Sequence, residues 1–411
     1  MKLKKSAILL VSSLIVTSLL AFPATADESA DAPEYSNSVD WNKFRDQNVT
    51  INVYNWGEYI SVDDGENLYD TNREFEELTG IKVNYTNFAS NEELYAKLKN
   101  GGSSYDIIIP SDYMIARMIN EDMLEKLDFS NIPNYSLIMD KFKGIDYDPT
   151  EEYSVPYMWG MVGIIYNTTL VDPEDDVYSW SILWNEKYAN NILMFSNSRD
   201  AFAIACKYLG YSMNTTDEQE LRNAAAALTN QKLLVQAYVM DEIFDKMTGG
   251  EAALAPYYAG DAITMIGDNP DLAYAVPREG TNLFVDAMCI PKGAKNKEAA
   301  EMYINFMCET KTALYNCEYI GYSTPQSEVS EYLDPELAAN PIAYPDEAVL
   351  ANTEAFIALP DDVTKLMDEL WTSILTANSS APWTIPVFLI ACLGASICIN
   401  VTRARKKKRG S

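Results

Sequence analysis

The side chains of this chain that could recognise a ligand are aromatic rings and carboxylates that lie close together in the sequence, next to predicted strands. They are Trp56, Glu58, Tyr59, Asp112, Tyr113, Tyr258, Asp261, Phe284 and Asp286, with the hydroxyl of Ser111 beside them. Ring faces attract ammonium groups, and carboxylates form charge-assisted hydrogen bonds with them. The pattern therefore indicates an organic cation as the ligand. Ordinary packing of aromatic residues in the core or at its rim would give the same pattern.

Enzyme chemistry is restricted by composition, because the chain of 411 residues contains no histidine. This excludes Ser-His-Asp and Cys-His nucleophiles, imidazole bases and His-ligated metals. The sequence also has no G-x-S-x-G motif, no Walker loop, no dinucleotide fingerprint and no C-x-x-C pair. We therefore expect no enzyme activity, no cofactor and no metal. A secreted hydrolase that uses a carboxylate pair stays as an alternative from another class, because acidic residues are abundant.

The charge of the chain is strongly unbalanced. Its 31 Lys and Arg residues stand against 60 Asp and Glu residues, which gives a formal net charge of −29. This composition argues against nucleic acid as a partner, because phosphate binding needs a basic face. It favours a cationic ligand, although solubility alone can explain an acidic surface.

Both ends of the chain have the features of targeting segments. Residues 1–26 combine a basic start, an apolar run and a small-residue site, which predicts a signal peptide. Residues 27–48 are rich in Ser, Ala and Asp and are expected to form a flexible leader. The uncharged residues 383–401 are just long enough for a transmembrane helix, and the basic tail 402–411 is expected to stay cytoplasmic. The predicted protein is exported and anchored on the outer face of the membrane by one span.

Strands and helices alternate between these ends. Strands are predicted at residues 51–56, 81–85, 105–109, 161–166 and 191–195. Helices are predicted at residues 199–209, 216–228, 241–249 and 296–308, and a further helix opens with a capping box of Ser90 and Glu93. This order predicts two α/β lobes with mainly parallel sheets, which bind ligands beyond the carboxyl ends of their strands. Four cysteines of the exported body are expected as buried thiols, although export permits disulfides: Cys206, Cys289, Cys308 and Cys317.

Several short motifs, in this order and at this spacing, resemble one family over residues 50–375. They are YNWGEY (54–59), GIKV (80–83), SNE (90–92), YDIIIPS (105–111), VPYMWG (155–160), SWSILW (179–184), LGY (209–211), PREG (277–280) and IGYSTP (320–325). The chain resembles the spermidine/putrescine-binding proteins of polyamine ABC transporters. The resemblance implies the two-lobed type II periplasmic-binding fold with a ligand cleft between the lobes, here with one C-terminal transmembrane helix added.

The resemblance also implies an aromatic box and the groups that hold amines. The box positions are Trp56, Tyr59, Tyr113, Tyr258, Phe284 and Tyr322. Ser111 stands where the family hydrogen-bonds an amine, and Asp286 where it grips an amino group. Asp200 replaces a usual Glu, Asn197 replaces an Asp of spermidine binders, and Phe356 replaces a Gln. Asp261 is similar to the acid of putrescine-preferring members, so the resemblance implies putrescine bound more tightly than spermidine.

The expected protein captures a polyamine between its lobes and delivers it to an ABC permease. Lobe 1 is expected to comprise residues 49–161 and 287–325, and lobe 2 residues 162–286 and 326–378. The chain is expected to cross between the lobes near residues 158–163 and 284–286. Another small cationic or polar solute, such as an amino acid derivative, stays open as the ligand.

Overall fold

The computed structural model describes residues 33–65, 67–101 and 104–377. Among these residues, no helix is both long enough and apolar enough to cross a membrane. The expected fold class is corrected on this point, because the part of the chain that is described forms two lobes without a membrane-spanning helix. The expected signal peptide 1–26, transmembrane helix 383–401 and cytoplasmic tail 402–411 all lie outside the described residues.

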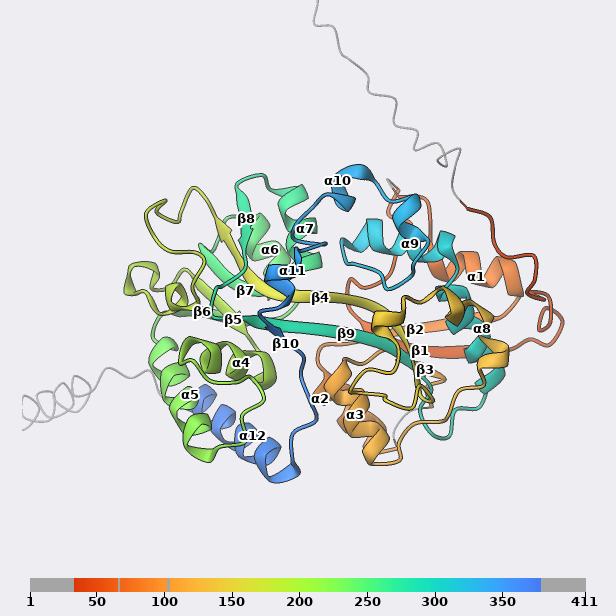
Figure 1. Cartoon of the computed structure of the whole chain (residues 1–411), viewed down its shortest axis with the longest axis horizontal. Coiled ribbons are helices and arrows are strands. Elements are labelled where there is room, and N and C mark those ends of the chain that lie inside the picture. Colours follow the sequence, from red (N-terminus) through yellow and green to blue (C-terminus); the bar gives the residue numbers. More distant parts are fainter. Residues whose placement is uncertain (1–32, 66, 102–103, 378–411) are drawn as a thin grey trace, which may run out of the picture.

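One sheet path of ten strands runs through both lobes (Figure 1), in the order β2-β1-β3-β9-β4-β7-β5-β6, with β10 paired to β9 and β8 paired to β4. In lobe 1, β1 pairs in parallel with β2 and β3. In lobe 2, β5 pairs in parallel with β6 and β7. The strands are β1 Thr50–Trp56, β2 Lys82–Phe88, β3 Ile107–Ile108, β4 Ser154–Asn167, β5 Ile192–Phe195, β6 Val235–Val239, β7 Leu254–Tyr258, β8 Leu272–Ala275, β9 Thr281–Cys289 and β10 Thr353–Glu354.

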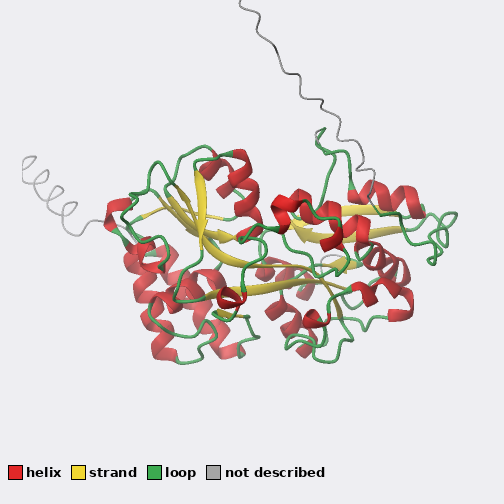
Figure 2. Cartoon of the chain, turned by 45° about the horizontal axis from the view of Figure 1, so that its top comes forward, coloured by secondary structure: helices red, strands yellow, loops and turns green. Residues whose placement is uncertain are grey.

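Helices cover both faces of the sheet in each lobe (Figure 2). Those of lobe 1 and its surface are α1 Thr71–Thr79, α2 Asn91–Lys99, α3 Asp112–Asn120, α8 Lys297–Met307, α9 Thr310–Ile320, α10 Pro335–Ala338 and α11 Glu347–Leu350. Those of lobe 2 are α4 Ser198–Tyr208, α5 Glu218–Gln231, α6 Ile243–Thr248, α7 Ala259–Asp268 and α12 Asp361–Thr376. Six short 3₁₀ turns occupy residues 129–131, 133–137, 140–142, 180–184, 186–188 and 329–331.

The long antiparallel strands β4 and β9 connect the two lobes (Figure 1). All residues of β4 except one are buried, because the strand is covered on both faces along its length. Its residue Trp159 belongs to the hydrophobic core of lobe 1, and Val162 belongs to that of lobe 2. The chain therefore passes from one core to the other within three residues of a continuous strand.

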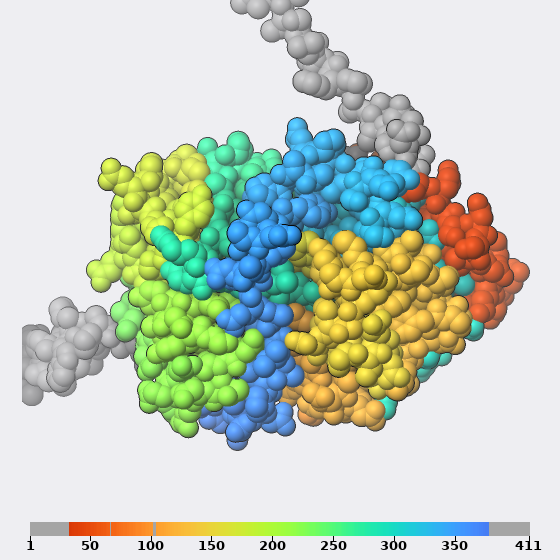
Figure 3. Space-filling model, viewed as in Figure 1, coloured from red at the N-terminus to blue at the C-terminus, as the bar shows by residue number. Residues whose placement is uncertain are grey.

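Two segments pack differently from the sequence-based expectation. Residues 27–48 were expected as a flexible leader, but in their described part, residues 33–48, Trp41 and Phe44 are buried in the core of lobe 1, where Trp41 packs edge-on against the ring of Phe306. Val329 and Leu333, expected in lobe 2, are also buried in the core of lobe 1. The chain after α9 then runs between the lobes (Figure 3) and reaches α12, the last described helix, which packs on lobe 2.

The close packing of β4 gives a test of the fold. A Cβ atom at Gly163 would lie 2.6 Å from the Tyr274 hydroxyl oxygen and 2.7 Å from the carbonyl oxygen of Ala275, whereas a Cβ at Gly267 meets nothing within 4 Å. We expect Gly163→Ala to lower the free energy of unfolding by about 1–3 kcal/mol through overpacking. Gly267→Ala, in α7, is the control and should raise it by about 0.5 kcal/mol. Urea unfolding of both variants measures this, and an unchanged Gly163→Ala variant would contradict the packing described.

Candidate functional site

A cavity of about 60 Å³ lies between the lobes and is lined from both of them. On this measure a single water needs about 10–15 Å³, so the space can hold a small molecule in place of several waters. Twelve of the thirteen residues predicted for the site line it: Trp56, Tyr59, Ser111, Tyr113, Asn197, Asp200, Tyr258, Asp261, Phe284, Asp286, Tyr322 and Phe356. The thirteenth, Glu58, is exposed and does not line the cavity.

Asp286 is the most firmly held carboxylate of the cavity. Ser111 and Asp286 face each other as an antiparallel bridge pair between the chain after β3 and the crossing strand β9. The Ser111 hydroxyl donates to Asp286 Oδ1 at 2.6 Å, and the Tyr59 hydroxyl donates to Asp286 Oδ2 at 2.7 Å. Each carboxylate oxygen therefore has one neutral donor and keeps a lone pair for a further donor.

Asp200 stands in the first turn of α4, on the lobe 2 side of the cavity. Asn197 caps this helix, and its side-chain oxygen accepts the backbone N–H of Asp200 at 2.9 Å. The Tyr258 hydroxyl donates to Asp200 Oδ2 at 3.0 Å. The helix N-terminus and the Tyr258 hydroxyl thus fix Asp200 in place. Asp286 is fixed in the same way by its backbone bridge to Ser111 and by two hydroxyl groups.

Burial dominates the electrostatics of these carboxylates. It raises the pKa of Asp286 and of Asp200 to about 6 each, although the hydrogen bonds that they accept act in the opposite direction. Burial also raises the pKa of Asp261 well above its ordinary value, and the nearby Asp241, Glu58 and Asp286 carboxylates add to that rise. The site therefore holds carboxyl groups whose charged forms are poorly solvated.

The aromatic residues form a frame around these acids. The rings of Tyr59 and Tyr322 meet edge-on with centroids 4.9 Å apart, and those of Tyr258 and Phe284 do so at 5.4 Å. Gly260, at the start of α7, allows the Tyr322 ring to pack against the helix, because a Cβ there would overlap the ring. Each ring is thus braced by another ring or by backbone, as a preorganised site for an organic cation requires.

The side of the cavity near Phe356 lies against a buried positive charge, in contrast to the acidic side chains elsewhere in the lining. The ring of Phe356 packs edge-on against Tyr113 with centroids 5.7 Å apart, and the guanidinium carbon of Arg199 lies 4.3 Å from the centre of the Phe356 ring. Arg199 is 4% exposed and donates to the carbonyl oxygens of Met213 and Ile357. A fixed positive charge therefore lies against the ring at this side.

Eight lining residues were missed by the sequence analysis: Gly57, Ser90, Asn91, Glu92, Met240, Asp241, Tyr257 and Asn282. Glu92 accepts the Tyr113 hydroxyl at 2.9 Å, and it was visible in the sequence only as part of the motif at residues 90–92. Asp241 follows β6, which was not predicted as a strand. The sequence analysis selected acids that follow predicted strands. If β6 had been predicted as a strand, Asp241 would have been selected as well.

The lining of the cavity contains five acids and, among the described residues, no Lys or Arg. The acids are Glu92, Asp200, Asp241, Asp261 and Asp286. Within the described ranges, no group of three or more acids or cysteines is placed to hold a metal ion. The four described cysteines are free and buried, away from this lining. The arrangement offers charge and hydrogen-bond acceptors to a cationic organic molecule.

Comparison with known proteins gives consistent matches. A family model described as bacterial extracellular solute-binding protein matches residues 72–345. The spermidine/putrescine-binding periplasmic protein of Escherichia coli (strain K12) is 36% identical over 310 residues, which cover 75% of this chain and 87% of that protein. The putrescine-binding periplasmic protein of Pseudomonas aeruginosa (strain UCBPP-PA14) is 28% identical over 80% of this chain and 92% of that protein.

A solved structure agrees with these matches. The spermidine/putrescine ABC transporter substrate-binding protein of Streptococcus pneumoniae superimposes with a TM-score of 0.67 and 36% identity, over 80% of this chain and 98% of that chain. The resemblance inferred from the motifs is therefore confirmed. The chain belongs to the bacterial extracellular solute-binding proteins, in the family of the spermidine/putrescine-binding proteins of polyamine ABC transporters, and it is a binding protein rather than an enzyme.

Proposed function

We propose that this chain captures polyamines outside the cytoplasm, with putrescine preferred over spermidine, and delivers them to an ABC permease. The observation that carries the proposal is the set of buried carboxylates without a basic residue in the lining. Desolvated carboxylates are unfavourable until a positive charge joins them. Protonated amines on a methylene chain supply that charge, and the aromatic frame covers the methylenes.

Asp286 is proposed to hold one ammonium group directly. Its two hydroxyl partners fix its plane and leave lone pairs toward the cavity, which suits a charge-assisted hydrogen bond. Asp286 interacts electrostatically with both Asp200 and Asp261. A second ammonium that pairs with either of these acids would relieve the remaining repulsion.

The preference for putrescine is proposed from the side of the cavity near Phe356. Spermidine has a third ammonium, and there it would meet the ring of Phe356, the amide of Asn197 and the buried charge of Arg199. Glu92 lies on the same side, but burial raises its pKa, which disfavours its charged form, and the nearby Arg199 charge opposes that rise only in part. We expect putrescine to bind about tenfold more tightly, a difference of only ~1.4 kcal/mol.

Substitution of Asp286 tests the proposed grip on the ligand. Asp286→Asn should weaken putrescine binding by about 1.5–3 kcal/mol, because the amide cannot provide a charge-assisted bond. Without ligand, the same variant should be more stable than wild type at pH 7–8 by about 1–3 kcal/mol, since a carboxylate with its pKa raised to about 6 destabilises the folded state above that pH. The stability difference should shrink as the pH falls through 6 and should vanish below about pH 3, where the carboxyl group is protonated in both the folded and the unfolded protein.

Calorimetry measures the affinity and urea unfolding measures the stability. Asp268→Asn, on the exposed end of α7, changes the net charge equally without touching the cavity, and it should change neither quantity. Wild-type affinity in the Asp286→Asn variant would contradict the proposed ammonium site.

Exchange of two residues tests the ligand preference. Asn197→Asp combined with Phe356→Gln should raise the affinity for spermidine relative to putrescine by about tenfold, because a carboxylate then meets the third ammonium. Aspartate is as good a helix cap as asparagine, so α4 should remain intact. Asn185→Asp, a similar cap elsewhere in lobe 2, is the matched control. Calorimetry with both ligands decides it, and an unchanged affinity ratio would show that these two positions do not set the preference.

A further inference from the structure

A second hollow of about 1170 Å³ lies where the lobes meet, and it is far larger than the ligand cavity. One wall is α7 of lobe 2, and the other is formed by α9, α10 and residues 67–69 of lobe 1 (Figure 1). We call this hollow the acidic groove. Its lining includes Leu68, Ile263, Thr264, Glu318, Tyr332 and Glu336.

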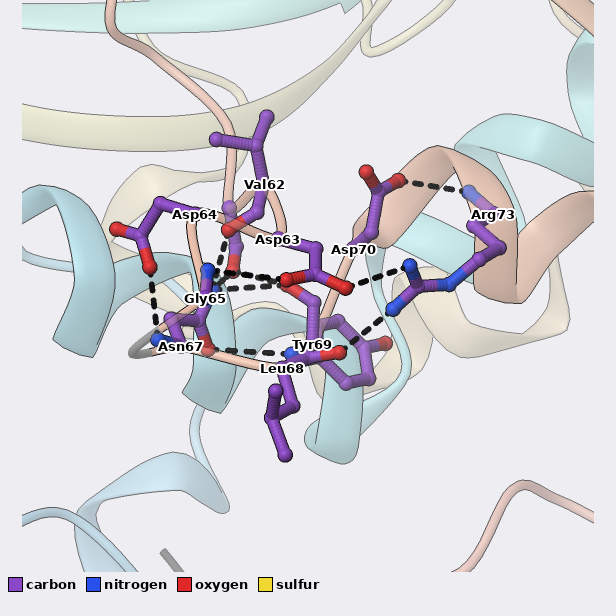
Figure 4. Close-up of polar contacts among 10 residues, drawn as sticks. Val62, Asp63, Asp64, Gly65, Asn67, Leu68, Tyr69, Asp70 and Arg73 are labelled. Atoms are coloured by element: carbon purple, nitrogen blue, oxygen red, sulfur yellow. Dashed lines mark hydrogen bonds and ion pairs between the residues drawn. The ribbon is translucent and has the colours of Figure 1, made fainter. Parts of the chain in front are cut away.

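Leu68 is held at the edge of the acidic groove by a network of polar contacts (Figure 4). The Asn67 side-chain amide donates to the carbonyl oxygens of Val62 and Tyr69 at 2.7 and 2.9 Å. Arg73 donates to the carbonyl oxygen of Leu68 at 2.7 Å and pairs with Asp63 at 2.8 Å. The Leu68 side chain points away from these contacts and is 61% exposed. Several side-chain hydrogen bonds thus fix the backbone here, and the Leu68 side chain stays exposed to solvent.

The chemistry of the acidic groove selects its partner. Leu68 and Tyr332, which is 41% exposed, give it apolar surface. Glu74, Glu318, Asp334 and Glu336 also line the groove, and none of its described lining residues is Lys or Arg. The nearby guanidinium of Arg73 contacts the backbone of Leu68, but its charge is paired with Asp63. A second copy of the chain, with a net charge of −29, and an anionic lipid surface would both be repelled. The complementary partner is a protein segment that combines an apolar side chain with Lys or Arg.

The two walls of the acidic groove belong to different lobes. Ile263 and Thr264 come from α7, whose neighbours Ala262 and Met265 are buried in the core of lobe 2. The wall formed by α9 belongs to the core of lobe 1. They touch where the Thr264 hydroxyl donates to the carbonyl oxygen of Ile320 at 3.5 Å. The shape of the groove therefore depends on the angle between the lobes.

We propose that the acidic groove is a docking surface for a basic, apolar-tipped segment of the permease. This inference rests on the proposed function, because only a transport protein has a permease partner. A segment seated against both walls contacts both lobes at once, so its affinity differs between open and closed forms. The groove would thus couple ligand capture to delivery without touching the ligand.

The test separates docking from ligand binding. Leu68→Asp and Glu336→Lys, two exposed changes in the acidic groove, should leave the putrescine dissociation constant within about twofold of wild type, because neither residue lines the ligand cavity. In cells whose own copy of this chain is deleted and replaced by the variant, uptake of labelled putrescine should fall about tenfold, the scale of ~1.4 kcal/mol of docking energy. Calorimetry and uptake are measured on the same variants.

Leu233→Asp and Glu174→Lys are the matched controls, because both residues are exposed on lobe 2 away from the acidic groove, and Leu233 is 65% exposed. Normal uptake in the groove variants, or an equal loss in the controls, would overturn the proposal. So would a variant that loses uptake only because it no longer binds putrescine.

Unchanged uptake with altered self-association or vesicle binding would assign the groove to a second copy or to a lipid surface. A wild-type chain that binds no polyamine would overturn the proposed function, and docking with it.

Discussion

The structure depends on a group of carboxylates that are kept between two lobes without a basic residue beside them in the cavity lining. Removing a carboxylate from water is costly, and two neutral hydroxyl donors offset only part of that cost at Asp286. The raised pKa of Asp286 and of Asp200 shows the remainder. A cationic ligand would offset this desolvation cost. We therefore expect the free energy of ligand binding and the lower stability of the ligand-free protein to have the same physical origin.

The backbone explains how such a site can be held in place. Strand β9 crosses between the lobes and carries Asp286, and its pairing with the chain after β3 places Ser111 opposite that carboxylate. Strand β4 runs beside it and brings the cores of both lobes within a few residues of the cavity. Of the candidate site acids, Asp286 therefore stands on a strand that joins the lobes, whereas Asp200 and Asp261 stand on α4 and α7 of lobe 2.

Much of this could be predicted from sequence because acids and rings follow strands that are themselves easy to recognise. The runs at β4 and β5 are buried almost without interruption and are mostly apolar, whereas β6 is an edge strand whose residues are mostly half-buried. Asp241 was missed with β6 for that reason. Trp41 and Phe44 were hidden in a segment of polar composition, and only the tertiary packing of lobe 1 shows that they are buried. The membrane helix expected from hydropathy lies beyond the described residues.

Proton release on ligand binding tests the central claim most directly. If the ligand restores the charge of carboxylates whose pKa is about 6, then putrescine binding at pH 6 should release roughly half a proton from each of Asp200 and Asp286, in addition to any proton that Asp261 gives up. The release is obtained by calorimetry in several buffers of different ionisation enthalpy at the same pH and salt concentration. The part that comes from Asp200 and Asp286 should decline as the pH rises toward 7.5, because both carboxylates are then ionised before the ligand arrives, and the Asp261→Asn variant isolates that part. Binding at pH 6 with no proton released would contradict the account.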